Sequence, residues 1–375
     1  MNKPGGSLGI LHLLLSITET SAPYNEHCQS LAGQRDITIC TYFRSDIPLP
    51  KEITLFEGDD SLTGFFRVLK AALDEKEYAI VHAHAPHVGF LFLVANLIYG
   101  RFIRSTVFTM HGSYRKLNNK LRNRLMLIPI FVFFQRVVCC SKASFESFPW
   151  FFKRLAGDRI CTVQNGIDID RVDQVIRNNQ QCLRNGSFVI TTVGRLIEIK
   201  NLLTVLRAFQ QYADQDSRLV FIGGGPMRDL LMAKSSESGL GKQIELTGLI
   251  PREKVYKNLT NADLFISASR GEGLPVAVLE AMACRSSVIL SDIPPHREIA
   301  NNVNFIPLVQ PDDIAGFARE IDRFRQMSPS ERADIGEKCR KLVEERFNLT
   351  NMHKGYEKVY AQLMGGDATL PWEIG

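Results

Sequence analysis

Residues 267–298 read SASRGEGLPVAVLEAMACRSSVILSDIPPHRE, and this stretch decides the fold class. The apolar run 262–268 predicts a short buried strand. The segment after Pro275 predicts a helix, because proline is tolerated in a first helical turn. The Gly-Glu-Gly loop between them lets a ligand approach the backbone closely. Backbone amides near Gly273 and Leu274, together with the helix dipole, predict an anion site at this junction.

Two glutamates flank that junction. Glu272 lies in the loop and Glu280 lies about two turns into the predicted helix, so a rise of about 1.5 Å per residue separates their carboxylates by roughly 10 Å. A glycosidase pair needs about 5 to 9.5 Å across one bond. The wider spacing favours two anchor points along one extended ligand over an acid/base pair.

Short apolar runs alternate with helical patterns over the whole chain, which is typical of parallel sheets with crossover helices. The runs are apolar throughout, as expected of sheets covered on both faces. We therefore predict an α/β protein of two doubly wound, Rossmann-like domains that face each other across a cleft, with the ligand at the carboxyl ends of the strands. The predicted strands are 8–15, 36–43, 78–84, 104–110, 136–140, 159–164, 187–193, 217–222, 243–247, 262–268, 286–291 and 303–308.

A polar, amide-rich segment separates the two halves. Residues 171–186 end in Arg-Asn-Gly and predict a linker. The first domain is then 1–170 and the second is 187–349. Residues 350–375 predict a C-terminal helix and tail that packs back on the first domain.

The composition fits two globular cores and excludes several classes of protein. The 375 residues are 45% hydrophobic and 23% charged with a net charge of +5, which gives no nucleic-acid footprint. Eight cysteines without a CxxC pair predict buried thiols in a reducing compartment, and hence a cytoplasmic protein. Leu8–Leu15 predicts a first strand in preference to a signal peptide. The longest apolar run, Leu125–Phe134, is too short for a bilayer, which needs about 20 residues.

The central stretch resembles a known family. Its E-x7-E, followed by E-A-M-A and S-D-x5-E, is similar to the retaining glycosyltransferases of family 4, which have the GT-B fold, and the resemblance covers nearly the whole chain. The resemblance implies that Glu272 contacts the transferred sugar near the reacting centre. It also implies that Glu280 binds the ribose hydroxyls of a nucleotide-sugar donor.

Further segments carry the same resemblance. Gly194-Arg195-Leu196 with Lys200 resembles the family's G-R-L…K signature, and Arg195 and Lys200 would supply positive charge to a diphosphate leaving group. Residues 223–226, Gly-Gly-Gly-Pro, resemble the family's G-x-G-P turn. The implied donor site consists of Gly194, Arg195, Lys200, Gly223, Gly224, Leu249, Ile250, Glu272, Gly273, Leu274, Pro275 and Glu280.

In the first half, His111-Gly112 resembles the family's H-G signature, which implies that His111 bonds a sugar hydroxyl or shapes the acceptor site. With Glu272, Arg195 and Lys200, it completes the implied catalytic set. Residues 165–168, Asn-Gly-Ile-Asp, match the segment that leads into the second domain. Asp168-Ile169-Asp170 spells the D-x-D of metal-dependent transferases of another fold. Because it lies in this connection, we read it as coincidence and expect no cofactor and no essential metal.

The sequence departs from the family at three places. Residues 16–27 contain no glycine where many relatives have a Gly-Gly loop against the donor phosphates. Asn201 stands where glycine is usual, and Arg285 stands where a small residue is usual. The glycine-free loop directs attention to the acceptor, for which the candidates are Glu19, Asn25, His27 and His84.

One segment hints at the acceptor. Residues 113–145 contain no acidic side chain and seven basic ones, and they enclose the run Leu125–Phe134. Basic residues beside apolar surface suit an anionic membrane, so we expect peripheral contact through residues 113–154. The alternative is a core helix with a solvated basic face. The basic residues are Arg115, Lys116, Lys120, Arg122, Arg124, Arg136 and Lys142.

The expected function is retaining transfer of a hexose-type sugar from a nucleotide sugar, with UDP-sugar favoured, to a glycan or lipid-linked acceptor in cell-envelope or exopolysaccharide synthesis. By resemblance, the leaving phosphate oxygen takes the proton of the acceptor in a front-face displacement. Two alternatives stay open: a nucleotide-sugar epimerase of GT-B-like fold, and a non-catalytic subunit that binds a nucleotide sugar.

Overall fold

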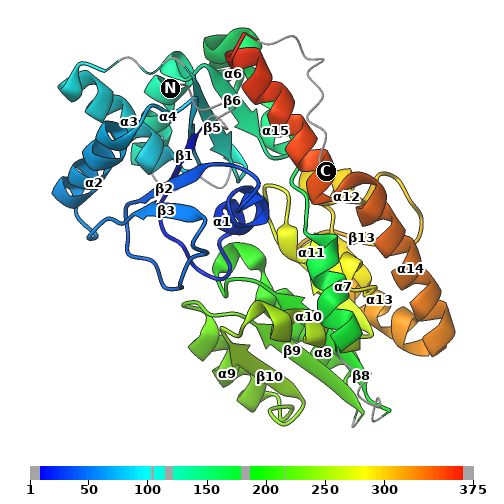
Figure 1. The fold of residues 1–375 in the computed structure, drawn as a ribbon. Coiled ribbons are helices and arrows are strands. Elements are labelled where there is room, and N and C mark those ends of the chain that lie inside the picture. The colour runs from blue at the N-terminus through cyan, green and yellow to red at the C-terminus, as the bar shows by residue number, and fades with distance from the viewer. Residues whose placement is uncertain are drawn as a thin grey trace. The chain divides into compact units, whose positions relative to one another are not determined.

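A computed structural model describes residues 9–101, 103, 105–114, 121–178, 186–214 and 216–365. Contacts within the chain divide it into two compact units, one of Met1–Asn165 with Thr350–Gly375 and one of Gly166–Leu349. Figure 1 shows the two sheets and their helices in chain order. The C-terminal segment thus belongs to the first unit.

The first unit is built on a seven-stranded parallel sheet of order β3-β2-β1-β4-β5-β6-β7. The order reverses between β1 and β4, and the carboxyl ends at such a point are where open α/β sheets bind ligands. The strands are β1 (Ile10–Leu14), β2 (Ile37–Thr41), β3 (Ile53–Phe56), β4 (Ile80–Ala83), β5 (Thr106–Met110), β6 (Arg136–Cys139) and β7 (Ile160–Thr162).

The two faces of this sheet have different chemistry. One face packs an apolar core under α2, α3, α4 and α6, which lie against one another in that order. The other face carries buried imidazoles and hydroxyls from the strands, which contact α1 and α15. The helices are α1 (Ala22–His27), α2 (Leu62–Glu75), α3 (Pro86–Tyr99), α4 (Leu121–Phe133), α5 (Lys142–Glu146), α6 (Trp150–Ala156) and α15 (Leu349–Leu363).

The expectation of strands that are apolar throughout is therefore only half right. Both faces are covered, as a parallel sheet requires, but His12 and His82 lie in the middle of neighbouring strands and are almost fully buried. A mostly apolar run predicts that a strand is buried. It does not predict on which face of the sheet the few polar side chains of that strand lie.

The second unit is a six-stranded parallel sheet of order β10-β9-β8-β11-β12-β13, which reverses between β8 and β11. Its strands are β8 (Phe188–Val193), β9 (Ser217–Ile222), β10 (Ile244–Gly248), β11 (Leu264–Ser267), β12 (Ser287–Ser291) and β13 (Leu308–Val309). Its helices are α7 (Ile169–Asn178), α8 (Leu202–Tyr212), α9 (Arg228–Glu237), α10 (Arg252–Asn261), α11 (Val276–Ala283), α12 (Pro294–Ala300), α13 (Ile314–Gln326) and α14 (Pro329–Arg346).

The predicted linker 171–186 is wrong over its first half, because residues 171–178 belong to α7. Val172 is buried, and the guanidinium of Arg340 on α14 donates to Asp173 at 2.9 Å. The Ile167 amide also donates to the Phe347 carbonyl at 2.9 Å, which fastens the start of α7 to the end of α14. The rest of the predicted linker, apart from Gly186, is residues 179–185, which lie outside the described residues.

The predicted basic and apolar segment has two faces. In α4, Leu127, Ile130 and Phe131 are buried in the core, whereas Leu125 and Phe133 are exposed. Arg122 is exposed as well, and Arg115, Lys116 and Lys120 lie outside the described residues. None of the described helices is both long and apolar enough to cross a membrane. One side of α4 thus packs in the core, as the alternative expected, and the contact of its exposed side with a membrane stays a prediction.

Candidate functional site

In the second unit, the ends of β8 and β9 meet backbone to backbone. The Gly194 amide donates to the Ile222 carbonyl at 2.9 Å, and the Leu196 amide donates to the Gly224 carbonyl at 2.8 Å. A Cβ on Gly223 would lie 2.0 Å from the Gly194 oxygen, and the φ of Gly223 is +136°. Only glycine can occupy that position, so the glycine-rich strand exit has a packing reason before any ligand is considered.

Lys200 and Glu272 form a buried ion pair at this edge. Lys200 ends a single 3-10 turn after β8, and its side chain lies over Gly194. Its Nζ donates to Glu272 Oε1 at 2.6 Å, and the Ser269 hydroxyl donates to the same oxygen at 2.7 Å. The side chains are 17% and 5% exposed. The pair brings together two residues that the sequence analysis placed in the donor site from segments 72 residues apart.

Glu280 on α11 has partners of its own. Arg252 Nε donates to Glu280 Oε1 at 3.0 Å, and the Tyr256 hydroxyl donates to the same oxygen at 3.0 Å. Both partners come from α10, four residues apart, so they project from one face of that helix. The sequence analysis missed both, although their spacing on a predicted helix was a readable signal. Glu272 and Glu280 therefore lie in separate ion pairs.

A buried histidine that the sequence analysis also missed lies near the pair. His296 is fully buried, and its Nδ1 contacts the Ser291 hydroxyl at 3.0 Å and the Ser291 carbonyl at 2.9 Å. Burial lowers its pKa to about 4, although the nearby Glu272 charge acts in the opposite direction. The imidazole is therefore neutral at pH 7 and adds no positive charge beside Glu272.

The other predicted donor residues lie along the carboxyl ends of the same strands. Arg195 is exposed after β8, and Leu249, 75% exposed, packs against Gly224 after β10. Ile250 is half-buried. Gly273, Leu274 and Pro275 are buried at the start of α11, which begins at Val276, directly after its N-cap residue Pro275.

Asn201 and Arg285, the two single-residue departures from the family, both have a left-handed backbone conformation. Asn201 has a φ of +55° and Arg285 has a φ of +61°. Left-handed backbone favours glycine, and asparagine is the side chain that tolerates it best. Asn201 uses its amide as well, because Nδ2 donates to the Pro311 carbonyl at 2.5 Å.

In the first unit, the predicted acceptor-side histidines belong to a larger cluster. His84 Nδ1 lies 3.0 Å from His111 Nε2, and the ring of His27 lies 4.8 and 5.5 Å from those two rings, centroid to centroid. His12 and His82, which the sequence analysis did not select, complete it.

Burial lowers the pKa of every histidine in this cluster: that of His12 to about 3 and that of His111 to about 4. His27, His82 and His84 shift in the same direction for the same reason. The cluster is therefore a set of neutral imidazoles at pH 7, able to donate and accept hydrogen bonds but carrying no charge.

The remaining acceptor-side candidates are structural in part. Asn25 is buried, and its Nδ2 donates to the Glu19 carbonyl at 3.0 Å and to the Ser21 carbonyl at 2.8 Å. Its amide thus braces the glycine-free loop. The Glu19 side chain is exposed.

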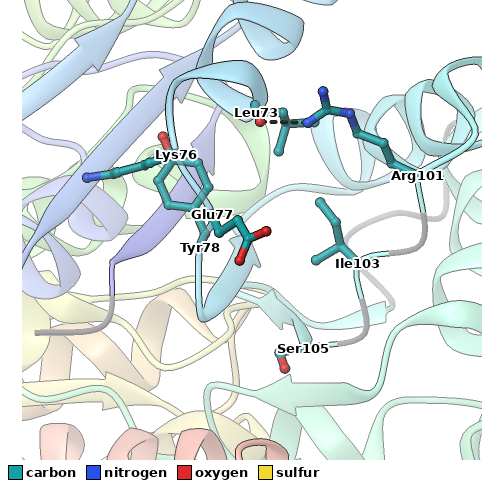
Figure 2. A pocket seen from close by; sticks show the side chains of 7 residues that line it. All are labelled: Leu73, Lys76, Glu77, Tyr78, Arg101, Ile103 and Ser105. Atoms are coloured by element: carbon teal, nitrogen blue, oxygen red, sulfur yellow. Dashed lines mark hydrogen bonds between the residues drawn. The ribbon is translucent and has the colours of Figure 1, made fainter. Parts of the chain in front are cut away.

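A cavity of about 400 Å³ lies at the opposite, amino-terminal edge of the first sheet (Figure 2). Lys76 pairs there with Asp36 at 2.6 Å, and Arg101 pairs with Asp74 and donates to the Leu73 carbonyl at 2.6 Å. Its cations are thus engaged by the protein, and it lies at the edge away from the strand ends that bind ligands in this fold.

Two doubly wound parallel sheets define an α/β protein with two Rossmann-like units, and the second carries glycine-rich strand exits and paired buried charges at its carboxyl edge. The description "Glycosyl transferases group 1" matches residues 176–342, and "Glycosyltransferase Family 4" matches residues 37–171. The chain therefore belongs to glycosyltransferase group 1, family 4, and has the GT-B fold.

Similar proteins agree with this assignment. The chain is 26% identical over 333 residues to the UDP-Gal:alpha-D-GlcNAc-diphosphoundecaprenol alpha-1,3-galactosyltransferase of Escherichia coli, which covers 84% of this chain and 82% of that protein. It is 26% identical over 239 residues to the GDP-mannose:cellobiosyl-diphosphopolyprenol alpha-mannosyltransferase of Komagataeibacter xylinus, covering 62% and 57%. Anabaena HepE, whose crystal structure contains UDP and glucose, has a TM-score of 0.78 at 17% identity over 95% and 100% of the two chains, which shows the fold.

Proposed function

We propose that this glycosyltransferase is a retaining hexosyltransferase that takes the sugar of a nucleotide donor, with UDP-sugar favoured, and passes it to a lipid-linked glycan. The observation that carries the proposal is the buried Lys200–Glu272 pair at the glycine-rich edge of the second sheet. A cation and a carboxylate held together at that edge match the two needs of a sugar diphosphate: charge neutralisation and hydroxyl recognition.

In the proposed donor complex, Lys200 and the exposed Arg195 neutralise the diphosphate. Glu272 orients the transferred sugar and stabilises positive charge on its ring. As the bond between sugar and phosphate breaks, negative charge grows on the leaving oxygen, and fixed cations stabilise it without reorganisation. That oxygen takes the proton of the acceptor hydroxyl in the front-face displacement. No metal is needed in this scheme, because side chains supply the positive charge.

Glu280 is assigned to the ribose of the donor. Arg252 and Tyr256 both donate to its Oε1, so the carboxylate is held in one orientation, and we assign its Oε2 to the ribose hydroxyls. A hydroxyl–carboxylate bond of this kind is charge-assisted and strong in a buried site. Arg252 and Tyr256 then act as positioning residues for nucleotide binding.

The acceptor proposal draws on the printed activities of relatives and on one surface. The named activities in Escherichia coli and Komagataeibacter xylinus both have a diphosphopolyprenol acceptor. In the first unit, large exposed apolar side chains gather on three neighbouring helices, among which α4 contacts both α3 and α6. They are Leu97, Ile98, Leu125, Ile128, Val132, Phe133, Trp150 and Phe151.

Charge on the same helices favours an anionic membrane as the partner. Arg122 and Arg154 are exposed on α4 and α6, the helices that carry Phe133 and Trp150. Aromatic side chains at such a surface insert at the headgroup level, while basic ones add about 1 kcal/mol each against anionic lipid. The proposed location is the inner face of the cell membrane, with peripheral attachment through these helices.

A donor screen tests the enzyme proposal. Purified protein is given UDP-, GDP- and ADP-sugars, and nucleotide release and thermal stabilisation are measured with and without a diphosphopolyprenol glycan. We expect UDP-sugar to bind and to release UDP only when acceptor is present, with the anomeric configuration retained. Interconversion of free nucleotide sugars would instead show an epimerase, and binding of a nucleotide sugar without transfer would show a non-catalytic subunit.

Liposome flotation tests the membrane proposal separately. Wild-type protein is expected to float with vesicles that contain anionic lipid and to remain below with neutral vesicles. Trp150→Ser with Phe133→Ser should abolish flotation and leave donor binding intact. Leu249→Ser, a change of an equally exposed apolar residue in the other unit, is the control and should float normally. If the double variant floated as well as Leu249→Ser, that result would contradict the proposal that this surface binds the membrane.

A further inference from the structure

Five of the eight histidines of the chain gather on one face of the first sheet, where the proposed reaction uses at most the outer one. His12 and His82 are register neighbours on β1 and β4, His84 and His111 follow β4 and β5, and His27 ends α1. Adjacent rings lie between 3.9 and 5.6 Å apart, centroid to centroid. Such a concentration of imidazoles is unusual for a core face, which is normally aliphatic.

Hydrogen bonds account for only some of the ring nitrogens. A chain runs from His12 Nδ1 to His84 Nε2 at 2.9 Å and from His84 Nδ1 to His111 Nε2 at 3.0 Å. His82 is fully engaged, because its two nitrogens contact the hydroxyls of Tyr360 and Thr109, each at 2.7 Å.

Two rings have unused nitrogens. His12 Nε2 is buried without a partner. Neither ring nitrogen of His27 makes a hydrogen bond to the described part of the chain, although His27 is only 4% exposed. Burying a polar nitrogen without a partner is costly, so the cluster leaves polar capacity that a ligand can satisfy.

Two sets of three histidines have ligand atoms that all lie within 4.8 Å of one another: His12, His82 and His84, and His27, His84 and His111. The first set would have to take His82 away from Tyr360 or Thr109, and all three of its members are buried. The second set uses the free nitrogens of His27, and its third member, His111, is half-buried, which leaves a route for an ion to enter.

We propose that His27, His84 and His111 bind one divalent transition-metal ion, Zn²⁺ or a metal of the same ligand preference, with the fourth position open to water or a substrate oxygen. Imidazole nitrogen is a preferred ligand of these metals, and three protein ligands with an open position is the arrangement of reactive rather than structural zinc sites. The site goes beyond the proposed sugar transfer, which does not require it.

The geometry fits with small movements. Tetrahedral zinc with Zn–N bonds of about 2.05 Å places its nitrogens about 3.4 Å apart. The His84 Nδ1 and His111 Nε2 atoms are 3.0 Å apart and need to separate slightly, and the ligand atoms of all three histidines already lie within 4.8 Å of one another. With the metal on Nδ1 of His84, its Nε2–H donates to His12 Nδ1, so His12 orients the ligand as outer partners of metal-bound imidazoles do. Burial lowers the pKa of all three ligands, which keeps them neutral and able to bind metal at pH 7.

The test is metal binding by tag-free, full-length protein stripped with chelator. After incubation with Zn²⁺ and dialysis, elemental analysis should give one zinc per chain, and Co²⁺ should produce the visible absorption of a four-coordinate site. His27→Gln and His84→Gln should each weaken Co²⁺ binding by at least about 100-fold, and His12→Gln, which removes only the outer partner, by about 10- to 100-fold. His87→Gln is the matched control, because His87 lies in the same unit but outside the cluster, and it should bind as the wild type does.

Absence of stoichiometric metal in the wild type would overturn the proposal, as would His27→Gln binding Co²⁺ with unchanged affinity and spectrum. The wild-type measurement does not depend on any variant folding, and circular dichroism of each variant separates lost ligands from lost structure. No step of the test measures sugar transfer, so its failure and a failure of the proposed function are distinguishable.

Discussion

The exposed Arg270–Asp312 pair is a useful comparison for the buried Lys200–Glu272 pair, and the comparison makes a sharp test. Arg270 in the same loop contacts Asp312 at the same distance, 2.6 Å, but those side chains are 43% and 68% exposed. Lys200 and Glu272 are 17% and 5% exposed. Burial is thus the main variable between Lys200→Met and Arg270→Met, since both replacements remove one positive charge and retain an unbranched stem.

The two variants should differ several-fold in their cost. At an effective dielectric constant of about 20, unit charges 2.6 Å apart attract by about 6 kcal/mol before desolvation is counted. Removal of one partner of a buried pair leaves an uncompensated charge and costs about 3 to 5 kcal/mol, whereas an exposed pair contributes about 0 to 1 kcal/mol. The Ser269 hydroxyl still donates to Glu272, so we expect the lower end, about 3 kcal/mol, for Lys200→Met.

The assay is thermal and urea unfolding of the wild type, both single variants and the double variant Lys200→Met with Glu272→Gln. For a unit of this size, about 3 kcal/mol lowers Tm by roughly 6 to 12 °C, and the control should lose at most about 4 °C. The double variant removes the orphaned carboxylate and should recover about 2 kcal/mol. Equal costs for Lys200→Met and Arg270→Met, or a double variant less stable than Lys200→Met, would refute the reasoning.

Three further outcomes follow from single features. Glu280→Gln preserves shape but loses the charge that the ribose hydroxyls meet, so UDP should bind at least about 10-fold more weakly by calorimetry, with secondary structure unchanged. Arg285→Gly should be more stable to urea than Arg285→Ala by about 0.5 to 1 kcal/mol, because only glycine relieves the φ of +61°; equal stability would remove strain as the explanation. In the presence of chelator, the first unit should lose stability as pH falls below about 6.5, by up to about 1.4 kcal/mol per pH unit for each buried histidine. The reason is that histidines of the unfolded chain bind protons first, whereas the folded pKa of His12 is about 3 and that of His111 is about 4. Urea midpoints that do not change between pH 7.5 and 5.5 would contradict this prediction.

Most of the sheet could be predicted, because buried parallel strands are short apolar runs. Two edge strands are exceptions. The strand β3, in which only Ile53 is buried, was not predicted, and β13 covers Leu308–Val309, whereas the sequence predicted a strand over 303–308. The error at α7 was avoidable. Val172, Val175 and Ile176 have the spacing of one helical face, which the surrounding amides and charges obscured.

The parts of the site that lie in one continuous segment could be predicted from the sequence. The parts that depend on how distant segments pack together could not. The loop that holds Glu272 and the glycines of the strand exits are continuous in sequence. The pairing of Glu280 with Arg252, by contrast, depends on how α10 packs against α11. The histidine cluster is the extreme case, since its members join only through the strand order β1-β4-β5 and the position of α1.

The two units differ in the charge of their buried polar side chains, and this difference affects which ligands each unit can bind. In the second unit, buried carboxylates are balanced by cations: Glu272 by Lys200 and Glu280 by Arg252. An anionic diphosphate can then enter a region that is already near neutral and share the cations. In the first unit, the histidine cluster consists of neutral bases whose pKa burial has lowered, so these side chains favour hydroxyls or a metal ion over an anion. This difference in charge supports the proposal that the donor diphosphate binds to the second unit.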